Sequence, residues 1–220
     1  MSEDLKKLIE QSIVCLPVYN EEEAISKMID DIRALSRDLV ITDGGSTDES
    51  LKIAELKGVK VLHRPGKGKG HGMIQAMQYA FDMKKDFIVY IDCDLTYPTD
   101  SIYSLLREAK DADMVVGSRS YQNMSLKSKF LNYCLRILML VLFFKYIKDA
   151  VSGLRVLRIE QYKDILRNQD MDLEIEMSAV SIRKGFKLKE IDYYTRVGRS
   201  KLSNKEIIRA FISLIKARFL

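Results

Sequence analysis

Residues 87–94 read Phe-Ile-Val-Tyr-Ile-Asp-Cys-Asp, an unbroken apolar run that ends in two aspartates separated by one residue. A short apolar run of this kind is typical of a strand that is buried on both faces of a sheet. Asp92 and Asp94 then lie where the strand leaves the sheet. Two carboxylates at such a position require either solvent or a cation.

The first half of the chain alternates short apolar runs with amphipathic helical patterns, which is typical of crossover units and a parallel sheet. We expect strands at 13–17, 39–42, 59–62, 87–91 and 113–117, and helices at 22–35, 46–57, 72–81 and 98–110. The predicted fold class is α/β, with an open, mostly parallel, Rossmann-like sheet flanked by helices and with amphipathic helices in the C-terminal half. Such sheets bind ligands beyond the carboxyl ends of their strands, where the strand order switches.

The 220 residues are 47% hydrophobic, which is enough for one sizeable core, and we expect a single domain over residues 1–220. Three cysteines without CxxC spacing indicate neither a disulfide framework nor a thiolate metal site, and they fit a reducing cytosol. The sequence shows no secretory signal and no run of the ~20 apolar residues that span a bilayer. A cytoplasmic location is therefore expected.

The net charge of +5 is concentrated in two segments. Residues 119–148 carry six Lys or Arg and no acid, and residues 195–220 carry seven against Glu206 alone. Phosphates or an anionic membrane are the natural partners of such segments.

Two stretches in these basic segments are predicted to be amphipathic helices, at 126–148 and 204–220. The centre of the first, residues 137–144, is apolar on every side but too short to span a bilayer. It is either a helix buried in the core or an interfacial helix with Lys and Arg at lipid headgroups. The second helix either docks onto the domain or binds a membrane surface, so a peripheral position at the cytoplasmic membrane face is one expectation.

The Asp92-Cys93-Asp94 string can hold one divalent ion if the chain turns between the carboxylates. Hard oxygen ligands suit Mg²⁺ or Mn²⁺, which in such sites also bind a substrate's phosphates, and this suggests a nucleotide. Alternatively, one Asp caps the helix that starts near Pro98 and the other is a solvated turn residue.

Three further polar strings follow predicted strands or precede a helix. Residues 17–21 (PVYNE) offer an aromatic ring and an acid to a base and ribose. Residues 43–48 (DGGSTD) bring backbone close to a ligand, although turn chemistry with Ser46 as a helix cap explains them equally well. Residues 65–72 (PGKGKGHG) offer N–H groups and two cations to phosphate, but their spacing disfavours a Walker-type NTPase or a dehydrogenase.

The order of these strings resembles glycosyltransferase family 2, whose members have the type A nucleotide-sugar fold. The resemblance covers residues 12–203 and rests on LPVYNEEEAI, ITDGGSTDES, GKGKG, YIDCDLTYP, VVGSR, DAVSGLR and RVGRSKLS. The SGLR string, residues 172–202 and the basic apolar stretch are most similar to dolichyl-phosphate mannose or glucose synthases. This implies a metal-dependent, inverting transferase that moves a hexose from GDP-mannose or UDP-glucose to a polyprenyl (dolichyl) phosphate.

The resemblance also implies roles for individual residues. Mg²⁺ or Mn²⁺ is expected on Asp92 and Asp94, and Thr96 stands where this subgroup often has Gln. Lys127 or Lys129 replaces an arginine that the family often carries after GSR. Contacts to the nucleotide are expected from Pro17, Tyr19, Glu21, Asp43, Lys69, Asp92 and Cys93. The acceptor phosphate is expected near Arg119, Ser152, Arg155 and Ser200, and catalysis is expected from Asp92, Asp94, Arg119, Arg155, Arg196 and Lys201.

The acceptor decides whether a protein base is needed. A lipid phosphate, with a second pKa of about 6, is already a dianion near neutral pH, whereas a hydroxyl needs a carboxylate or His to take its proton. The alternative function is a soluble family-2 transferase that acts on a small sugar or other hydroxyl acceptor with Asp149 as base. For Asp149, a role as a helix cap or an arginine partner is favoured over that of a base. A non-catalytic basic module would leave the two aspartates unexplained, and the sequence shows no nucleic-acid-binding motif, so no nucleic acid is expected.

Overall fold

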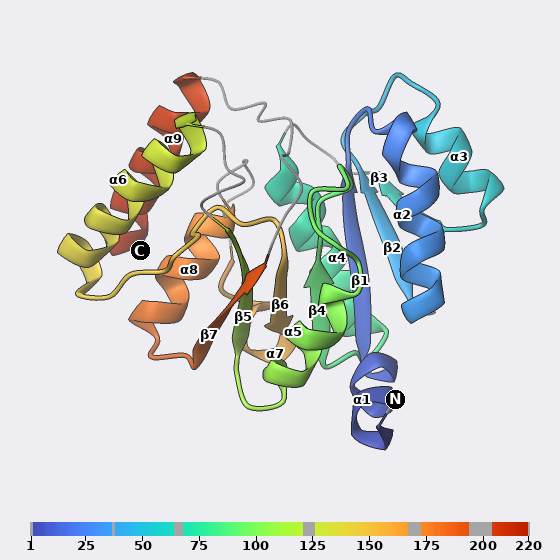
Figure 1. Ribbon diagram of the computed structural model, residues 1–220, viewed down its shortest axis with the longest axis horizontal. Coiled ribbons are helices and arrows are strands. Elements are labelled where there is room, and N and C mark those ends of the chain that lie inside the picture. Colours follow the sequence, from blue (N-terminus) through green and yellow to red (C-terminus); the bar gives the residue numbers. More distant parts are fainter. Residues whose placement is uncertain are drawn as a thin grey trace.

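The computed structural model describes residues 2–36, 38–63, 68–120, 126–166, 173–193 and 204–219 (Figure 1). Seven strands form one sheet in the order β3-β2-β1-β4-β6-β5-β7, in which β6 alone runs antiparallel to its neighbours. The predicted open, mostly parallel α/β sheet is confirmed. The strands are β1 (Ser12–Val18), β2 (Leu39–Asp43), β3 (Lys60–His63), β4 (Phe87–Tyr90), β5 (Met114–Arg119), β6 (Arg155–Arg158) and β7 (Leu188–Tyr193).

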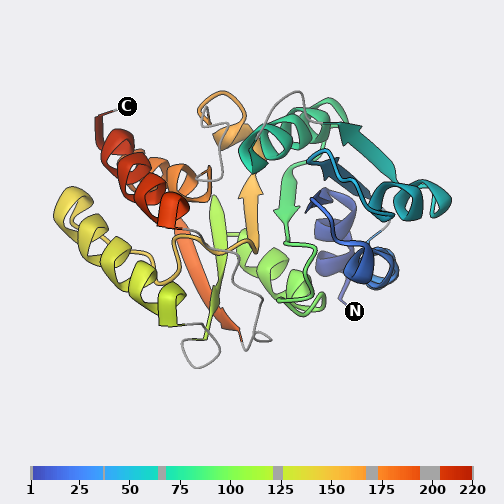
Figure 2. The same ribbon diagram turned by 90° about the horizontal axis from the view of Figure 1, so that it is seen from above.

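Helices cover both faces of the sheet, and Figure 2 shows α4 and α5 on opposite sides. One face packs against α1 (Glu3–Glu10), α2 (Glu22–Leu35), α3 (Ser50–Leu56) and α5 (Ser101–Ala109). The other face packs against α4 (Lys69–Asp82), α6 (Leu126–Phe143), α7 (Ile159–Tyr162), α8 (Leu173–Arg183) and α9 (Asn204–Phe219).

The central strands are apolar throughout because both faces are covered. In β4, Ile88 and Tyr90 enter one core cluster, whereas Phe87 and Val89 enter the other. This alternation follows from the two-residue period of a strand. It explains why the run before Asp92 lacks the polar residues of a half-exposed strand.

Several helix boundaries differ from the sequence prediction: α5 begins at Ser101 rather than Pro98, and α6 ends at Phe143 rather than at residue 148. Helix α3 begins at Ser50 rather than Ser46, and α4 begins at Lys69 rather than Gly72. Ser46 is not a helix cap, because its N–H donates to the Asp43 carboxylate within a turn. The Asp48 carboxylate accepts from Ser50 N–H, which delays the start of the helix.

The sequence analysis did not place α1, α7, α8, β6 or β7. Helix α1 is short and buries only Leu5 and Ile9, which is too weak a pattern for prediction from sequence. Strand β6 is four residues long and follows α6 without a crossover helix, so the alternation of the first half does not extend to it. Among the described helices, none combines the length and apolarity required to cross a bilayer.

Candidate active site at the carboxyl edge of the sheet

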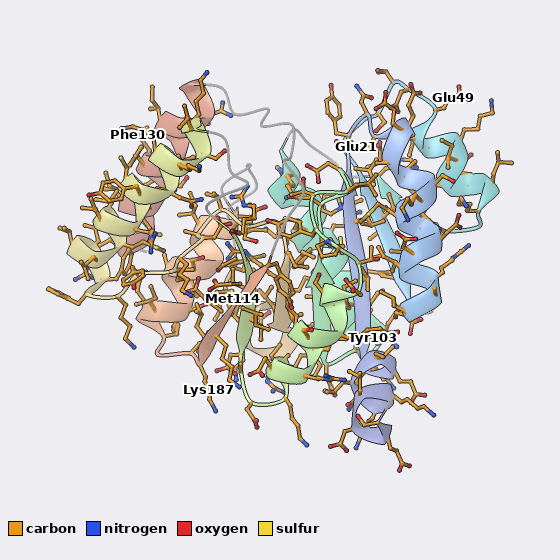
Figure 3. The ribbon with its side chains drawn as sticks, in the orientation of Figure 1. Glu21, Glu49, Tyr103, Met114, Phe130 and Lys187 are labelled. Atoms are coloured by element: carbon orange, nitrogen blue, oxygen red, sulfur yellow. The ribbon has the colours of Figure 1, made fainter. Side chains whose placement is uncertain are left out.

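The candidate site residues lie at the edge where the parallel strands end, which is uppermost in Figure 1. Strand β1 has β2 on one side and β4 on the other, so the strand order switches there. Figure 3 labels Glu21 at this edge and Lys187 at the opposite one. Three strings that are distant in sequence therefore share the position at which open α/β sheets bind ligands.

Lys69 connects two carboxylates at the centre of this edge. Its Nζ donates to Asp92 Oδ1 at 2.5 Å and to Glu174 Oε1 at 2.7 Å, and all three side chains are mostly buried. Burial alone would lower the pKa of Lys69, but the two carboxylates outweigh it and raise that pKa above its usual value. The ammonium group is therefore charged at every physiological pH.

Glu174 is a site residue that the sequence analysis did not assign. It lies in the first turn of α8, where every residue from Leu173 to Ser181 is buried. A carboxylate in such a run requires a partner, because a buried unpaired charge is costly. The acids at 174 and 176 within an apolar helix were the only sequence signal for this contact.

Gly153 allows Asp92 to take its position. A Cβ atom built on Gly153 would overlap the Asp92 carboxylate, so only glycine fits there. The backbone of the SGLR string therefore lies directly against the Asp92 side chain. Gly153 was also missing from the predicted site residues.

Asp94 is exposed and follows Asp92 after one intervening residue, Cys93. Its Oδ1 accepts from Thr96 N–H at 3.0 Å, and Leu95 between them has a φ of 59°, which is uncommon for a non-glycine residue. The hydroxyl of Thr96 is buried without a hydrogen-bond partner in the described part of the chain. The turn thus leaves the Asp94 carboxylate exposed just beyond the end of β4.

The residues present fit a Mg²⁺ or Mn²⁺ ion that is held jointly with a substrate. The described ranges contain no group of three or more His, Cys, Asp or Glu that could enclose a metal by themselves. Asp92 and Asp94 supply hard oxygen atoms, and Mg²⁺ sites in enzymes commonly take their other ligands from water and substrate phosphates.

The loops after β1 and β2 are joined by hydrogen bonds. Asn20 N–H donates to Ser46 Oγ at 3.0 Å, and Asn20 Oδ1 accepts from Thr47 N–H at 2.8 Å. Asp43 is buried and accepts from Gly45 N–H at 2.7 Å, so the turn chemistry considered for residues 43–48 is present. Beside these loops Tyr19 is 55% exposed, so its side chain is accessible at this edge.

The side chains of Pro17 and Cys93 are less accessible at the carboxyl edge than that of Tyr19. Pro17 is half-buried in β1, and Cys93 is buried in the core cluster below α2 and α5. Burial raises the pKa of the Cys93 thiol well above its usual value, so the thiol is neutral. Because its side chain points inward, any nucleotide contact of Cys93 has to come from its backbone.

Arg119 and Asp149 form a second ion pair. Arg119 Nε and Nη2 donate to the two Asp149 oxygens at 2.6 and 2.9 Å, and the Arg119 backbone N–H also donates to Asp149. Asp149 is fully buried, which alone would raise its pKa, but the charge and the hydrogen bonds of Arg119 together outweigh burial and the pKa is lowered. Asp149 is an arginine partner, as one of the two interpretations of the sequence expected.

Arg155 and Ser152 are buried residues whose donors form hydrogen bonds inside the protein. The Arg155 side chain is fully buried and donates to the carbonyl oxygens of Ser152, Ala150 and Glu174. The Ser152 hydroxyl donates to Gly117 O and is also buried. Their donors face inward and hold the segment 149–153 in this structure, and the expected contact of Arg155 and Ser152 with the acceptor phosphate stays a prediction.

Three predicted residues, Arg196, Ser200 and Lys201, lie outside the described residues. Lys127 is exposed and Lys129 half-buried in the first turn of α6. The structure brings together Tyr19, Asp43, Lys69, Asp92, Asp94 and Arg119 at the carboxyl edge, with Glu174 and Gly153 added.

The fold is similar to that of glucosyl-3-phosphoglycerate synthase from Mycobacterium tuberculosis, solved with Mn²⁺ and UDP-glucose. The TM-score is 0.80 at 20% identity, over 99% of this chain and 84% of that one. This likeness shows the type A fold.

Curated sequence relatives include a dolichyl-phosphate hexose transferase of Haloferax volcanii, 29% identical over 86% of this chain and 85% of that protein. An undecaprenyl-phosphate mannosyltransferase of Micrococcus luteus is 23% identical over 93% of this chain and 92% of that protein. The model of the family described as glycosyl transferase family 2 matches residues 13–177. The chain therefore belongs to glycosyl transferase family 2.

Proposed function

We propose that this glycosyltransferase moves a hexose from GDP-mannose or UDP-glucose to a polyprenyl (dolichyl) phosphate, with inversion at the anomeric carbon. The bond from the anomeric carbon to the donor diphosphate breaks, and a bond to an acceptor phosphate oxygen forms. The nucleoside diphosphate leaves, and no proton needs to be moved. The names of two relatives that act on lipid phosphates support this choice of acceptor.

The observation that carries the proposal is the state of Asp149. Both of its oxygens accept from Arg119 and the residue is fully buried, so it is poorly placed to take a proton from a hydroxyl group. The alternative, transfer to a small hydroxyl acceptor, relied on Asp149 as base. An acceptor that arrives as a phosphate dianion makes a base unnecessary.

Binding of the donor is assigned to the edge formed by β1, β2 and β4. Tyr19 offers a face on which a nucleobase can stack, and Asp43 and Glu21 lie in the loops beside it. Lys69 stands between Asp92 and Glu174 and can exchange one carboxylate for a phosphate oxygen. A Mg²⁺ or Mn²⁺ ion at Asp92 and Asp94 would supply positive charge to the leaving diphosphate.

The acceptor phosphate is assigned to Arg119, whose side chain is 19% exposed while Asp149 fixes the orientation of its guanidinium group. Arg196 and Lys201 complete the proposed cation set around the phosphates, and Ser200 offers a neutral hydroxyl beside them. Preorganised cations of this kind typically lower a barrier by several kcal/mol.

The proposal is tested by supplying radiolabelled GDP-mannose or UDP-glucose, each with a short polyprenyl phosphate and Mg²⁺ or Mn²⁺, followed by organic extraction. Label in the organic phase that mild acid releases supports the proposal and identifies the donor. Label that stays in water with both donors, despite nucleotide binding, would overturn it.

A further inference from the structure

Helices α6 and α9 lie side by side and run in the same direction at the end of the molecule beyond β7 (Figures 1 and 2). The sequence left α6 as either a core helix or an interfacial helix, and the structure shows one buried and one exposed side. The buried side of α6 carries Leu131, Leu135 and Met139, and that of α9 carries Ala210, Leu214 and Ala217.

The opposite sides of both helices carry large exposed apolar side chains. With about 100° of rotation per residue, those of α6 repeat every three or four positions and form one stripe. Phe130, labelled in Figure 3, is 65% exposed, Leu126 at the start of the stripe is 83% exposed, and Phe144, which directly follows α6, is 84% exposed. We name this surface the α6/α9 face; its members are Leu126, Phe130, Tyr133, Ile137, Leu140, Val141 and Phe144 with Ile208, Ile212 and Ile215.

Basic side chains flank each stripe. At the same helical rotation, Lys127 lies on one side of the α6 stripe and Lys129 and Arg136 on the other. On α9, Arg209 and Lys216 lie on one side of the isoleucines and Arg218 on the other, all three exposed. The sequence has no acidic residue in 126–148 or 207–220.

An exposed apolar surface of this extent marks an interaction site. A second copy of the chain would bring two positively charged rims together, which is unfavourable. Anionic lipid headgroups complement the rims, and the acyl region just below them accepts the apolar stripes. We infer that the α6/α9 face docks on the surface of an anionic lipid bilayer, with both helix axes close to the membrane plane.

The position of the face relative to the site agrees with this orientation. Helix α6 begins at the carboxyl edge of the sheet (Figure 1) and its 18 residues extend about 27 Å away from that edge. At its far end the face adjoins a pocket of about 480 Å³ lined mainly by Leu140, Phe144, Tyr146, Ile182, Phe186 and Leu188. If the proposed lipid-phosphate acceptor is correct, docking through this face brings headgroup-level phosphates to the edge that holds Arg119.

The test is co-sedimentation of the full chain with vesicles of phosphatidylcholine alone or with 30% phosphatidylglycerol, at low and high salt. We expect binding to the anionic vesicles that weakens with salt, and about a tenfold loss of binding in Phe130→Glu and in Val141→Glu. Leu56→Glu is the matched control, because Leu56 is 80% exposed on α3, away from the face, and should bind as the wild type does.

Equal vesicle binding by all variants, or no binding by the wild type, would overturn the inference. Analytical ultracentrifugation tests the other possible occupant, a second copy of the chain. A wild-type dimer that Phe130→Glu dissociates would assign the face to that second copy. Transfer to a short, detergent-dispersed polyprenyl phosphate should persist in both variants. Vesicle binding without any lipid-phosphate transfer would therefore leave the docking surface standing and remove only the proposed acceptor.

Discussion

Asp92 and Asp149 lie in the same part of the fold and each pairs with a basic side chain, yet their surroundings differ. The Asp92 side chain is 32% exposed and shares Lys69 with Glu174, whereas Asp149 is fully buried and receives two hydrogen bonds from the Arg119 side chain. A partly exposed carboxylate can exchange its partner for a metal or a phosphate-bound ion. A buried, fully paired carboxylate supports structure, because losing its partner leaves an uncompensated charge.

The largest expected effect is on turnover in Asp94→Ala. Removing the exposed carboxylate from the proposed metal site should lower kcat by a factor on the order of 10²–10³, since preorganised charge at the leaving group is lost. Steady-state kinetics measures the loss. Asp111→Ala changes an exposed aspartate in the loop before β5 and should be neutral; undiminished turnover in Asp94→Ala would remove the metal site from the catalytic scheme.

Asp149→Asn should act mainly on stability. Breaking a buried pair by altering one partner costs about 3 kcal/mol or more, which urea unfolding measures directly. Unchanged stability would contradict this role, and loss of transfer to a hydroxyl acceptor at unchanged stability would instead identify Asp149 as a base.

The stability that the Arg119–Asp149 pair contributes should depend on pH. Because Arg119 lowers the pKa of Asp149 in the folded state, the pair contributes stability above the unfolded aspartate pKa of about 3.9. That contribution is lost as pH falls below this value toward the folded pKa. The difference in unfolding free energy between wild type and Asp149→Asn should therefore be constant near neutrality and shrink in acid; a constant difference down to acid pH would contradict it.

Lys69→Met should reduce kcat/KM by about 30-fold, because Asp92 and Glu174 then face each other without the shared cation. The control is Lys85→Met. Lys85 pairs with Asp38 at 2.6 Å and its side chain is 14% exposed, against 16% for Lys69, but it lies at the opposite edge of the sheet. Similar losses of activity in both variants would show that Lys69 acts through stability alone.

The smallest effect is expected in Glu174→Gln. Glutamine still accepts a hydrogen bond from Lys69 but loses the charge, so we expect about a fivefold decrease in kcat/KM. Restoration of activity in Glu174→Asp would support positioning of Lys69 by a carboxylate. Full activity in Glu174→Gln would show that Asp92 alone sets the orientation of Lys69.

The sequence was most informative where the chain repeats one pattern, an apolar strand followed by a polar loop. Strands β1, β2 and β4 are continuous apolar runs followed by polar strings, so the sheet and the position of Asp43, Asp92 and Asp94 were predictable from pattern and the topology of open sheets. The order of strings that resembles family 2 added the expected roles of individual residues, which stay predictions.

The remaining features depend on contacts across long sequence separations. Glu174 reaches Lys69 from 105 residues away, and Gly153 is required by the Asp92 side chain. The resemblance of the SGLR string to the family placed Arg155 near the acceptor phosphate, but its side-chain nitrogens find carbonyl, hydroxyl and sulfur acceptors inside the protein. The burial of a fully hydrogen-bonded arginine side chain cannot be predicted from a single sequence.

The most direct measurement compares two acceptors of identical chain length, phytanyl phosphate and phytanol, with the labelled donor that the enzyme uses. A site without a protein base should glycosylate the phosphate and leave the alcohol unmodified at neutral pH. Comparable transfer to phytanol, or to a soluble sugar but not to the phosphate, would contradict transfer to a lipid phosphate at the Asp92 edge.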